Sequence, residues 1–535
     1  MVYHDLREYL SELKKRNLLT EIDKEIQLET ELMPLVRLQF KGLPEKQRKG
    51  FLFTNVYDSK GRHYDGAVTT GVLSSSIDVY AAGMECEPDK VSDRFTEAIE
   101  SPIEPRVVTD AKVQEVVVTG KDLDAKGLSD IPLPVEIPGY SCQVRTTTAF
   151  VTKDVETGIQ NAGTYSGQIF GPRKILWEVH RGSHGFMHLR KAASNGSKTL
   201  DAAIVIGGPP YVQYTAASKV PYGLDEFAVS GGLAGEPIDV VKCKTVDLYV
   251  PANAEYIIEG KVSVEDFEPQ TPFGEYTGYV AADVESQWCP VMEITAVTHR
   301  KDKPIFQTII SQFPPSESSK LRQVAYGSAF TKFLRNDCGL PNVTKVAFHE
   351  SSGSWQYCVV QIKKDAPTDA MRALVCASGY AADIGKVFIA VDDDIDPFDP
   401  DSVNWALSFR MQPHRDMQLI KGKTAHLDPS VFVKGQSDAN SGYREASAIL
   451  IDATRKTDYP PTSLPKKEYM LKAKEIWESL DLPELSLKQP WHGYNLEKWS
   501  DEYDRYARMV LNGEHFKIGE ELAKKRVKKD ILGEI

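Results

Sequence analysis

Between about residues 110 and 310, the chain repeats one pattern that restricts its fold more than any other feature. Short runs rich in β-branched residues alternate with Gly, Pro, Asn and Asp; the runs read VQEVVV, TTTAFV, AAIVIG, TVDLYV, MEITAVT and PIFQTII. β-Branched side chains favour extended backbone, and the residues between the runs favour turns. Many short strands at this spacing predict a β-barrel or a β-sandwich.

The segments before this region contain both helical and strand-like patterns of apolar residues. Apolar residues recur with helical spacing over residues 4–17, 29–40 and 75–100, and the strand-like run FLFTNV lies at 51–56. This mixture predicts a small α/β unit at the N-terminus.

The segments after the β-rich region are helical again. Ser316 can cap a long helix over about residues 318–335, which would connect two domains. Beyond it, the runs VTKVAFHE, QYCVVQIK and KVFIAVD alternate with helical patterns, which predicts an open α/β layer. Residues 466–480 and 497–526 are helical and polar and form a C-terminal extension.

The length, charge and cysteines of the chain exclude some classes of function. A chain of 535 residues is too long to fold around a single hydrophobic core. Its net charge of −12 argues against nucleic acid as the main partner. The N-terminus lacks the apolar run of a signal peptide, and no run approaches the ~18 to 20 residues of a membrane span. The seven cysteines are odd in number and never in CxxC spacing. They predict reduced thiols in a cytoplasm rather than a zinc ribbon or an iron–sulfur cluster.

Three histidines, His180, His184 and His188, stand four residues apart in HRGSHGFMH. This spacing fits one turn of a helix or one face of a strand, and Gly182 and Gly185 favour the strand. Such a ladder can ligate a metal ion. Partly exposed strand histidines are the alternative.

Three other stretches place polar groups at turns. NAGTYSGQIFGPRK, residues 161–174, can cradle an anion with backbone N–H groups or form an ordinary hairpin. Glu226 in YGLDEFAVSGG is either a metal ligand or a solvated turn acid. VDDDID, residues 391–396, follows a predicted strand. It is either a ligand site, since α/β sheets bind ligands at the C-terminal ends of their strands, or an Asp-rich turn.

QTPFGEYTGY, residues 270–279, predicts a tight bend because it holds Pro272, Gly274 and Gly278. The bend aims Glu275 either at water or at a substrate. Taken alone, the residues describe an acidic multidomain protein with α/β and β parts. An enzyme that uses a divalent ion is one interpretation of them.

The stretches also occur in an order that resembles one protein family. DLREYLSELKKRNLLTEID is followed by TGIQNAGTY, HRGSHG, GLDEFAVSGGLAGEPIDVVKCKTVDLYVPA, PFGEYTGY, PPSESS and KVFIAVDDDIDPFDPDSVNWAL. Together they resemble the UbiD family of reversible decarboxylases, which use prenylated FMN. The resemblance covers most of the chain and is weakest over residues 461–535.

The resemblance implies a mixed α/β and β multidomain fold. Its expected parts are an N-terminal α/β unit (1–109), a flavin-reductase-like split β-barrel that binds prenylated FMN (110–312), a linker helix (313–336), a C-terminal α/β domain (337–460) and a helical extension (461–535).

The resemblance also implies two ions at the cofactor phosphate. A divalent cation, manganese or alternatively iron or magnesium, would be bound by Asn161, His184 and Glu226. The expected ligands of a potassium ion are Thr215, Ala216, Ser218 and Glu226. The expected cofactor-binding residues are Asn161, Thr164, Tyr165, Ser166, Ser183, His184, Glu226 and Lys386. His180 and His188 inherit no ligand role.

The chain departs from the family at two catalytic positions. Where the family commonly has an Arg that holds the substrate carboxylate, this chain has Ser166. Gln270 stands where the family has the first of its two catalytic acids. Glu275, the second acid, remains, and Glu268 could replace the first. An Arg fork binds a carboxylate in a way that Ser cannot. This departure implies a substrate anchored by a second group, such as the aroyl-CoA of phthaloyl-CoA decarboxylases or a polycyclic aryl carboxylate.

The expected function is therefore non-oxidative, reversible decarboxylation of an aromatic acid or aroyl-CoA, with Glu275 as proton donor and with Gln270 and Ser166 beside it. The expected partners are CO₂, a flavin prenyltransferase that supplies the cofactor, and further copies of the chain in a dimer or hexamer. One alternative is a non-catalytic flavin-binding subunit of a multisubunit aryl carboxylase. Another is an ordinary FMN oxidoreductase on the same barrel.

Overall fold

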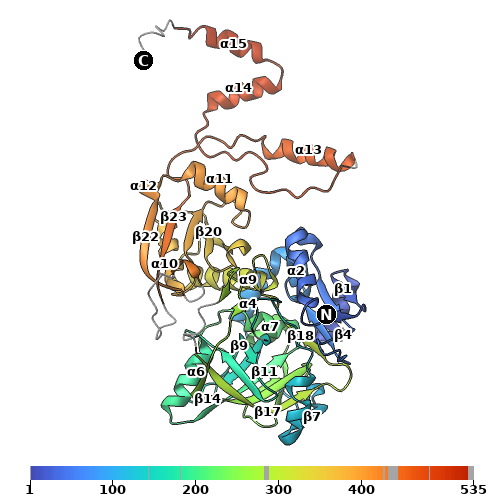
Figure 1. The fold of residues 1–535 in the computed structure, drawn as a ribbon. Coiled ribbons are helices and arrows are strands. Elements are labelled where there is room, and N and C mark those ends of the chain that lie inside the picture. The colour runs from blue at the N-terminus through green and yellow to red at the C-terminus, as the bar shows by residue number, and fades with distance from the viewer. Residues whose placement is uncertain are drawn as a thin grey trace.

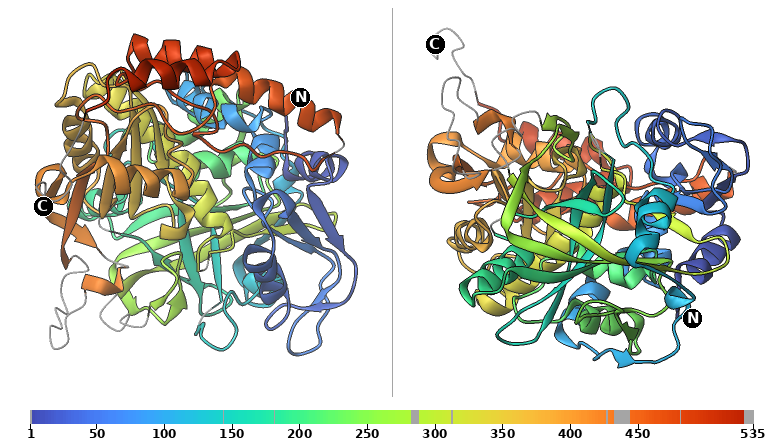
Figure 2. Two further views of the ribbon diagram at one scale, coloured as in Figure 1. Left: turned by 90° about the horizontal axis from the view of Figure 1, so that it is seen from above. Right: turned by 60° about the horizontal axis from the view of Figure 1, so that its bottom comes forward.

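The computed structural model describes residues 2–142, 144–180, 182–281, 288–311, 313–425, 428–431, 444–480 and 482–527. A β-barrel lies between an N-terminal α/β unit and a C-terminal α/β layer, as the right view of Figure 2 shows. A helical extension leaves the C-terminal layer and stands away from the rest of the molecule (Figure 1).

The predicted barrel is present and is closed by six antiparallel strands. They are β8 (Arg145–Lys153), β9 (Gln160–Ile169), β10 (Lys174–Glu178), β11 (Thr199–Ile206), β14 (Tyr256–Pro269) and β17 (Trp288–His299). The sheet closes because Ile175 of β10 lies opposite Ile169 of β9 on one side and Met292 of β17 on the other. β7 (Val116–Thr119) extends the sheet beyond β17.

The N-terminal unit is a four-stranded sheet with helices. Its sheet runs in the order β1 (Leu19–Ile22), β3 (Gly50–Phe53), β5 (Ala67–Thr70) and β18 (Ile305–Gln307), and β2 (Ile26–Gln27) pairs separately with β4 (Val56–Tyr57). Its helices are α1 (Leu6–Lys15), α2 (Leu32–Gly42), α3 (Ile77–Gly83) and α4 (Val91–Glu100). The apolar face predicted for the first helix is buried.

Two of the β-rich runs lie outside the barrel. PIFQTII supplies β18, which pairs in parallel with β5 of the N-terminal sheet. TVDLYV ends in β13 (Tyr249–Pro251), which joins β12 (Asp239–Lys242) and β6 (Arg106–Val107) in a separate small sheet. Their composition predicts strands correctly, but strand propensity does not specify the partner strand.

The helices α6 (His184–Ser194), α7 (Pro210–Ala216) and α8 (Glu226–Ala234) lie around the barrel. The helix α9 (Glu317–Lys332) follows the barrel in the chain. The short α5 (Leu123–Lys126) follows β7. α9 is the predicted connecting helix, and it contacts α4 on one side and β19 of the C-terminal layer on the other. It begins at the predicted cap, since the Ser316 hydroxyl accepts a bond from the Ser319 amide and the Ser319 hydroxyl accepts one from the Ser316 amide.

The C-terminal layer is a mixed five-stranded sheet. Its order is β19 (Val343–Phe348), β20 (Tyr357–Ile362), β21 (Val387–Val391), β23 (Arg444–Asp452) and β22 (Met417–Ala425), with helices α10 (Asp369–Tyr380), α11 (Pro400–Arg410) and α12 (Pro413–Asp416). Asp392 and Asp394 of the VDDDID stretch are buried and bind the buried guanidinium of Arg410 at 2.9 and 2.7 Å. These acids therefore belong to a structural ion cluster, which favours the turn interpretation.

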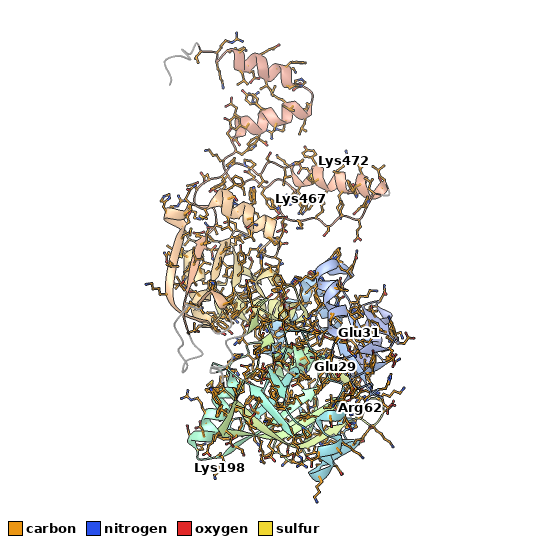
Figure 3. The ribbon with its side chains drawn as sticks, viewed as in Figure 1. Glu29, Glu31, Arg62, Lys198, Lys467 and Lys472 are labelled. Carbon is orange, nitrogen blue, oxygen red and sulfur yellow. The ribbon has the colours of Figure 1, made fainter. Side chains whose placement is uncertain are left out.

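The extension contains α13 (Lys467–Ser479), α14 (Asp501–Leu511) and α15 (His515–Ala523). None of these helices buries a residue. Figure 3 labels Lys467 and Lys472 on α13, which lies apart from the body of the molecule. Over the described residues, no helix is long and apolar enough to cross a membrane.

Candidate active site

Asn161, His184 and Glu226, the three expected ligands of the divalent cation, lie together although they come from three elements. Asn161 is near the start of β9, and His184 and Glu226 are the first residues of α6 and α8. His184 Nδ1 lies 3.1 Å from Asn161 Oδ1 and 4.0 Å from Glu226 Oε1. Among the described residues, no three His, Cys, Asp or Glu side chains form a metal cluster, so a cation here would need the Asn161 amide oxygen.

The strand predicted for HRGSHGFMH is wrong, because α6 begins at His184. The Ser183 hydroxyl caps this helix by accepting a hydrogen bond from the Phe186 amide at 3.3 Å. A Cβ on Gly185 would lie 2.8 Å from the Trp177 ring, so this glycine allows close packing of α6 on the barrel. The two glycines of this stretch therefore do not exclude a helix. His188 is buried, with Nδ1 2.9 Å from the Thr152 hydroxyl.

The electrostatics of this group fit a bound cation. Burial raises the pKa of Glu226 to about 8, although the Ala162 amide donates to its carboxylate at 2.8 Å. Burial lowers the pKa of His184 to about 4, which leaves the imidazole neutral and able to bind a metal. The Asn161 Nδ2 is buried without a hydrogen-bond partner. A divalent cation would supply the positive charge that these buried oxygen and nitrogen donors lack.

Thr215, Ala216 and Ser218, the residues expected at a potassium ion, lie at the end of α7 and just beyond it. The Thr215 hydroxyl is 2.7 Å from the Ser230 hydroxyl, and Ser230 donates to the Glu226 carbonyl at 2.8 Å. The Ser218 hydroxyl donates to the Thr215 carbonyl at 2.7 Å. Hydrogen bonds therefore link the end of α7 to the helix that starts at Glu226.

The residues expected to contact the cofactor are divided between two places. Tyr165 accepts a hydrogen bond from the Gly185 amide at 3.2 Å, and Thr164 has a buried hydroxyl without a partner. Both lie on β9 beside Ser166. Lys386 lies in the C-terminal layer, where its ammonium group binds Asp428 and Ser430 at 2.7 and 2.6 Å. Its expected phosphate contact stays a prediction.

Glu275 lies in the predicted bend, between the two-residue strands β15 (Phe273–Gly274) and β16 (Val280–Ala281). Gly278 takes φ of +93°, which glycine adopts readily, and its amide donates to the Glu275 carbonyl at 3.0 Å. Only 13% of the Glu275 side chain is exposed. Its carboxylate lies 3.4 Å from Arg145 Nη1 and accepts a hydrogen bond from the Tyr276 amide at 3.1 Å. Glu275 is therefore held by the protein rather than solvated.

Arg145, at the start of β8, is the centre of a buried ion cluster that the sequence analysis missed. It contacts three carboxylates, those of Glu136, Glu178 and Glu275, at 2.7, 3.3 and 3.4 Å. The only sequence signal is an Arg at the start of an otherwise apolar and threonine-rich strand. The cluster forms because Ser166 of β9 pairs with Thr147 of β8 on one side and with Glu178 of β10 on the other.

Gln270 and Ser166 belong to the same cluster. Gln270 is buried and lies beside the Glu178 carboxyl group, whose pKa it lowers. The Ser166 hydroxyl lies 3.3 Å from that of Thr147, which in turn donates to Glu136. Glu268, the suggested replacement acid, instead binds Lys174 at 2.7 Å and is 42% exposed, so it does not belong to the cluster.

Two family models match this chain. The model of the Rift-related domain of 3-octaprenyl-4-hydroxybenzoate carboxy-lyase (UbiD) matches residues 106–314, and that of the C-terminal domain of the same enzyme matches residues 323–453. An uncharacterized protein of Archaeoglobus fulgidus is 30% identical over 478 residues, which are 85% of this chain and 92% of the relative.

Solved structures are similar over almost the whole chain. An evolved dimeric form of the UbiD-class enzyme HmfF from Pelotomaculum thermopropionicum, in complex with prFMN, has a TM-score of 0.74 and 28% identity. The similarity covers 88% of this chain and 100% of that one. Vanillic acid decarboxylase of Sedimentibacter hydroxybenzoicus, in its closed form, has a TM-score of 0.76 and 25% identity, with coverage of 90% and 100%.

Proposed function

Because the chain belongs to the UbiD family of carboxy-lyases, we propose that it is a non-oxidative, reversible decarboxylase of an aromatic acid or aroyl-CoA that uses prenylated FMN. One observation carries the proposal: β9 joins two groups of polar side chains. Asn161 belongs to the group with His184 and Glu226, and Ser166 belongs to the cluster around Arg145 and Glu275. One group suits a cation and its phosphate, and the other suits proton transfer.

We propose that Asn161, His184 and Glu226 hold a divalent cation, manganese or alternatively iron or magnesium, and that Thr215, Ala216, Ser218 and Glu226 hold potassium. These ions would bind the cofactor phosphate beside Thr164, Tyr165 and Ser183. An ion is needed because Glu226 is itself an anion when ionised. When bound, prenylated FMN would supply an electron sink for the carbon that loses CO₂.

Glu275 is the proposed proton donor to that carbon. General acids of this kind must lie within hydrogen-bond reach of the atom that they protonate, and they are held in place by neighbours. Arg145 and the Tyr276 amide hold the two oxygens of Glu275. Gln270 can orient neighbouring groups but carries no proton at neutral pH.

Arg145 is a poor candidate for binding the substrate carboxylate. A guanidinium has five N–H donors. The Nε–H group donates to Glu136. The two N–H groups of Nη1 donate to Glu178 and Glu275, and those of Nη2 donate to Glu136 and the Gly274 carbonyl. With every donor used and Ser166 in place of the family Arg, a substrate anchored through another group, such as a CoA thioester or a polycyclic ring system, fits this site best.

The remaining parts of the proposal concern partners. A flavin prenyltransferase would supply the cofactor, and CO₂ is the product or co-substrate. We also propose a homo-oligomer, a dimer or hexamer, supported by the exposed apolar side chains of the extension. A cytoplasmic location is supported by the seven cysteines, all of which are free thiols.

The test is to co-express the chain with a flavin prenyltransferase and to study the purified protein by native mass spectrometry, visible spectroscopy and a CO₂-release assay with aromatic acids and aroyl-CoA thioesters. The proposal expects bound cofactor, a metal ion and turnover by this chain alone. Flavin without turnover would favour the second candidate, a non-catalytic subunit of an aryl carboxylase, which the changes at Ser166 and Gln270 favour. Redox turnover with NAD(P)H would favour an FMN oxidoreductase.

A further inference from the structure

The cluster around Arg145 holds more negative than positive charge. Its guanidinium is 2% exposed, and the carboxyl groups of Glu136, Glu178 and Glu275 are 5%, 6% and 13% exposed. Arg37 lies beside Glu136 and donates to its carbonyl, so with all three acids ionised the group would carry one uncompensated negative charge. Like charges that share a buried site rarely ionise together. One of the three carboxyl groups is therefore expected to keep a proton at neutral pH.

The contacts distinguish the three acids. Glu136 accepts from Arg145 Nε and Nη2 at 3.1 and 2.7 Å and from the Thr147 hydroxyl, so it is the acid best held as an anion. Glu275 accepts from a backbone amide and is the most exposed of the three. Glu178 and Glu275 both contact Arg145 only through Nη1, at 3.3 and 3.4 Å, and Glu178 is the more buried of the two, at 6% against 13% exposed. The proton therefore belongs on Glu178.

The surroundings of Glu178 point the same way. Burial raises the pKa of Glu178, and the neighbouring Glu275 carboxylate raises it further, while Arg145, Gln168 and Gln270 oppose this shift. The charged and titratable groups that face Glu178 are Arg145, Glu275 and, from β17, the Cys289 thiol. Glu136 and Arg37 lie near Arg145, and His180 lies near Glu275.

We propose that Glu178 is a proton-holding and positioning residue that exchanges its proton with Glu275 at Arg145. This inference rests on the proposed function, in which Glu275 protonates the substrate carbon. Both carboxyl groups lie within hydrogen-bond range of one nitrogen, Arg145 Nη1. In the exchange, the O–H bond of Glu178 breaks and an O–H bond forms on Glu275, directly or through one water. Solvent later returns the proton to the pair, and the carboxylation direction reverses these steps.

The proposal also explains the two glutamines beside this acid. Gln168 Nε2 donates to Glu178 Oε1 at 2.8 Å, and the Thr271 amide donates to Gln168 Oε1 at 3.3 Å. Gln270 lies beside the same carboxyl group. Both glutamines orient Glu178 without competing for its proton, because an amide does not titrate near neutral pH.

The first test uses the protein without cofactor and does not depend on activity. Infrared spectra in H₂O and D₂O, recorded from acid to alkaline pH, would compare the wild type with Glu178→Gln and with the control Glu268→Gln. Both changes remove one carboxyl group, but Glu268 binds Lys174 and lies outside the cluster. Because Glu226 also keeps a proton at neutral pH in the cofactor-free protein, we expect Glu178→Gln to remove one component of the carboxylic-acid C=O absorption and Glu268→Gln to remove none. A band that is the same in the wild type and Glu178→Gln would overturn the proposal.

The second test uses the cofactor-loaded enzyme and the pH profile of kcat. A group that must be protonated loses activity as the pH rises through its pKa. We expect Glu178→Gln to lower kcat by roughly tenfold or more and to change this alkaline limb, with partial recovery in Glu178→Asp. The control Glu268→Gln should keep the shape of the profile. Identical profiles for all variants would refute the exchange, whereas an inactive enzyme that shows the infrared band refutes the proposed function alone.

Discussion

Glu275 shows how much of this site depends on one residue far away in sequence. The bend that carries it is a local feature, but the direction of its carboxylate is set by Arg145, which lies on β8, 130 positions away. Buried ion pairs require good geometry to offset the cost of removing charges from water. Five donors, all used, give Arg145 that geometry and give Glu275 one orientation.

Replacing Glu275 by Gln should therefore abolish turnover without removing the cofactor. The amide keeps the shape of the side chain but cannot donate a proton, so kcat should fall by about 100-fold or more. The visible spectrum of the loaded protein reports cofactor retention. The matched control is Glu268→Gln, which alters an exposed acid near the same bend and should keep wild-type turnover. Normal kcat in Glu275→Gln would exclude it as the acid.

The cation site makes a prediction about pH. Since burial raises the pKa of Glu226 to about 8, a cation must displace a proton from this carboxyl group at lower pH. Affinity of the cofactor-free protein for Mn²⁺ should therefore rise with pH and level off above about 8. Calorimetry in buffers of different ionisation enthalpy would count the released proton.

A matched pair of histidine variants checks the ligands. His184→Ala should lower the affinity for Mn²⁺, whereas His188→Gln, on the same helix but bonded to Thr152, should keep it. Equal affinity in both variants, or affinity independent of pH, would place the cation elsewhere.

The residues of the site differ in how far the sequence could predict them. Asn161, His184 and Glu226 each stand in a motif, so the ordered motifs identified them before their geometry was known. Arg145 and Glu178 stand in no motif. They meet because the register of three strands puts them on one face, and a sequence pattern fixes the face of a residue but not the partner strand.

At the scale of elements, the anchoring of α9 depends on its first residue. Glu317 is fully buried, and its carboxylate accepts from the amides of Gly71, Leu73 and Ile310 at 2.8, 2.9 and 3.0 Å. These amides lie just beyond β5 and β18. One side chain thus joins the connecting helix to the N-terminal sheet.

Replacing Glu317 by Ala should destabilise the protein strongly. Three buried amides would lose their acceptor, and each unsatisfied donor costs about 1–3 kcal/mol, so we expect a loss of several kcal/mol in the free energy of unfolding. Chemical denaturation measures this loss. The control, Glu97→Ala, removes an exposed acid of α4 and should change stability by less than about 0.5 kcal/mol. A loss no larger than that of the control would show that the carboxylate is dispensable.

The sequence predicted elements better than their connections. The cap at Ser316 and the long helical pattern after it are local signals, and α9 starts where they place it. β18 was equally visible as a strand, but its partner, β5, lies more than 200 residues earlier and belongs to another sheet. The helix at His184 was missed because glycine in the first turn serves packing on Trp177, which helix propensity does not include.

At the scale of the whole molecule, the body and the extension are built differently. The body has large clusters of fully buried apolar side chains, in the N-terminal unit, barrel and C-terminal layer. The extension exposes large apolar side chains on all three helices, including Ile476, Val510, Leu511 and Phe516, at 51%, 53%, 63% and 78%. Helices of 9 to 13 residues are marginal in water unless an apolar face is covered.

We expect a second copy of the chain to cover the exposed apolar side chains of the extension. Deletion of residues 461–535 should therefore lower the oligomeric state and leave the body folded. Light scattering after size-exclusion chromatography measures the mass, and circular dichroism and thermal melting check the body. A matched control keeps the extension but changes exposed charges, Lys467→Ser and Lys472→Ser on α13, and should keep the full mass (Figure 3). If the truncated chain forms the same oligomer as the full chain, the extension does not hold the copies together, and the apolar faces of its helices must serve another partner.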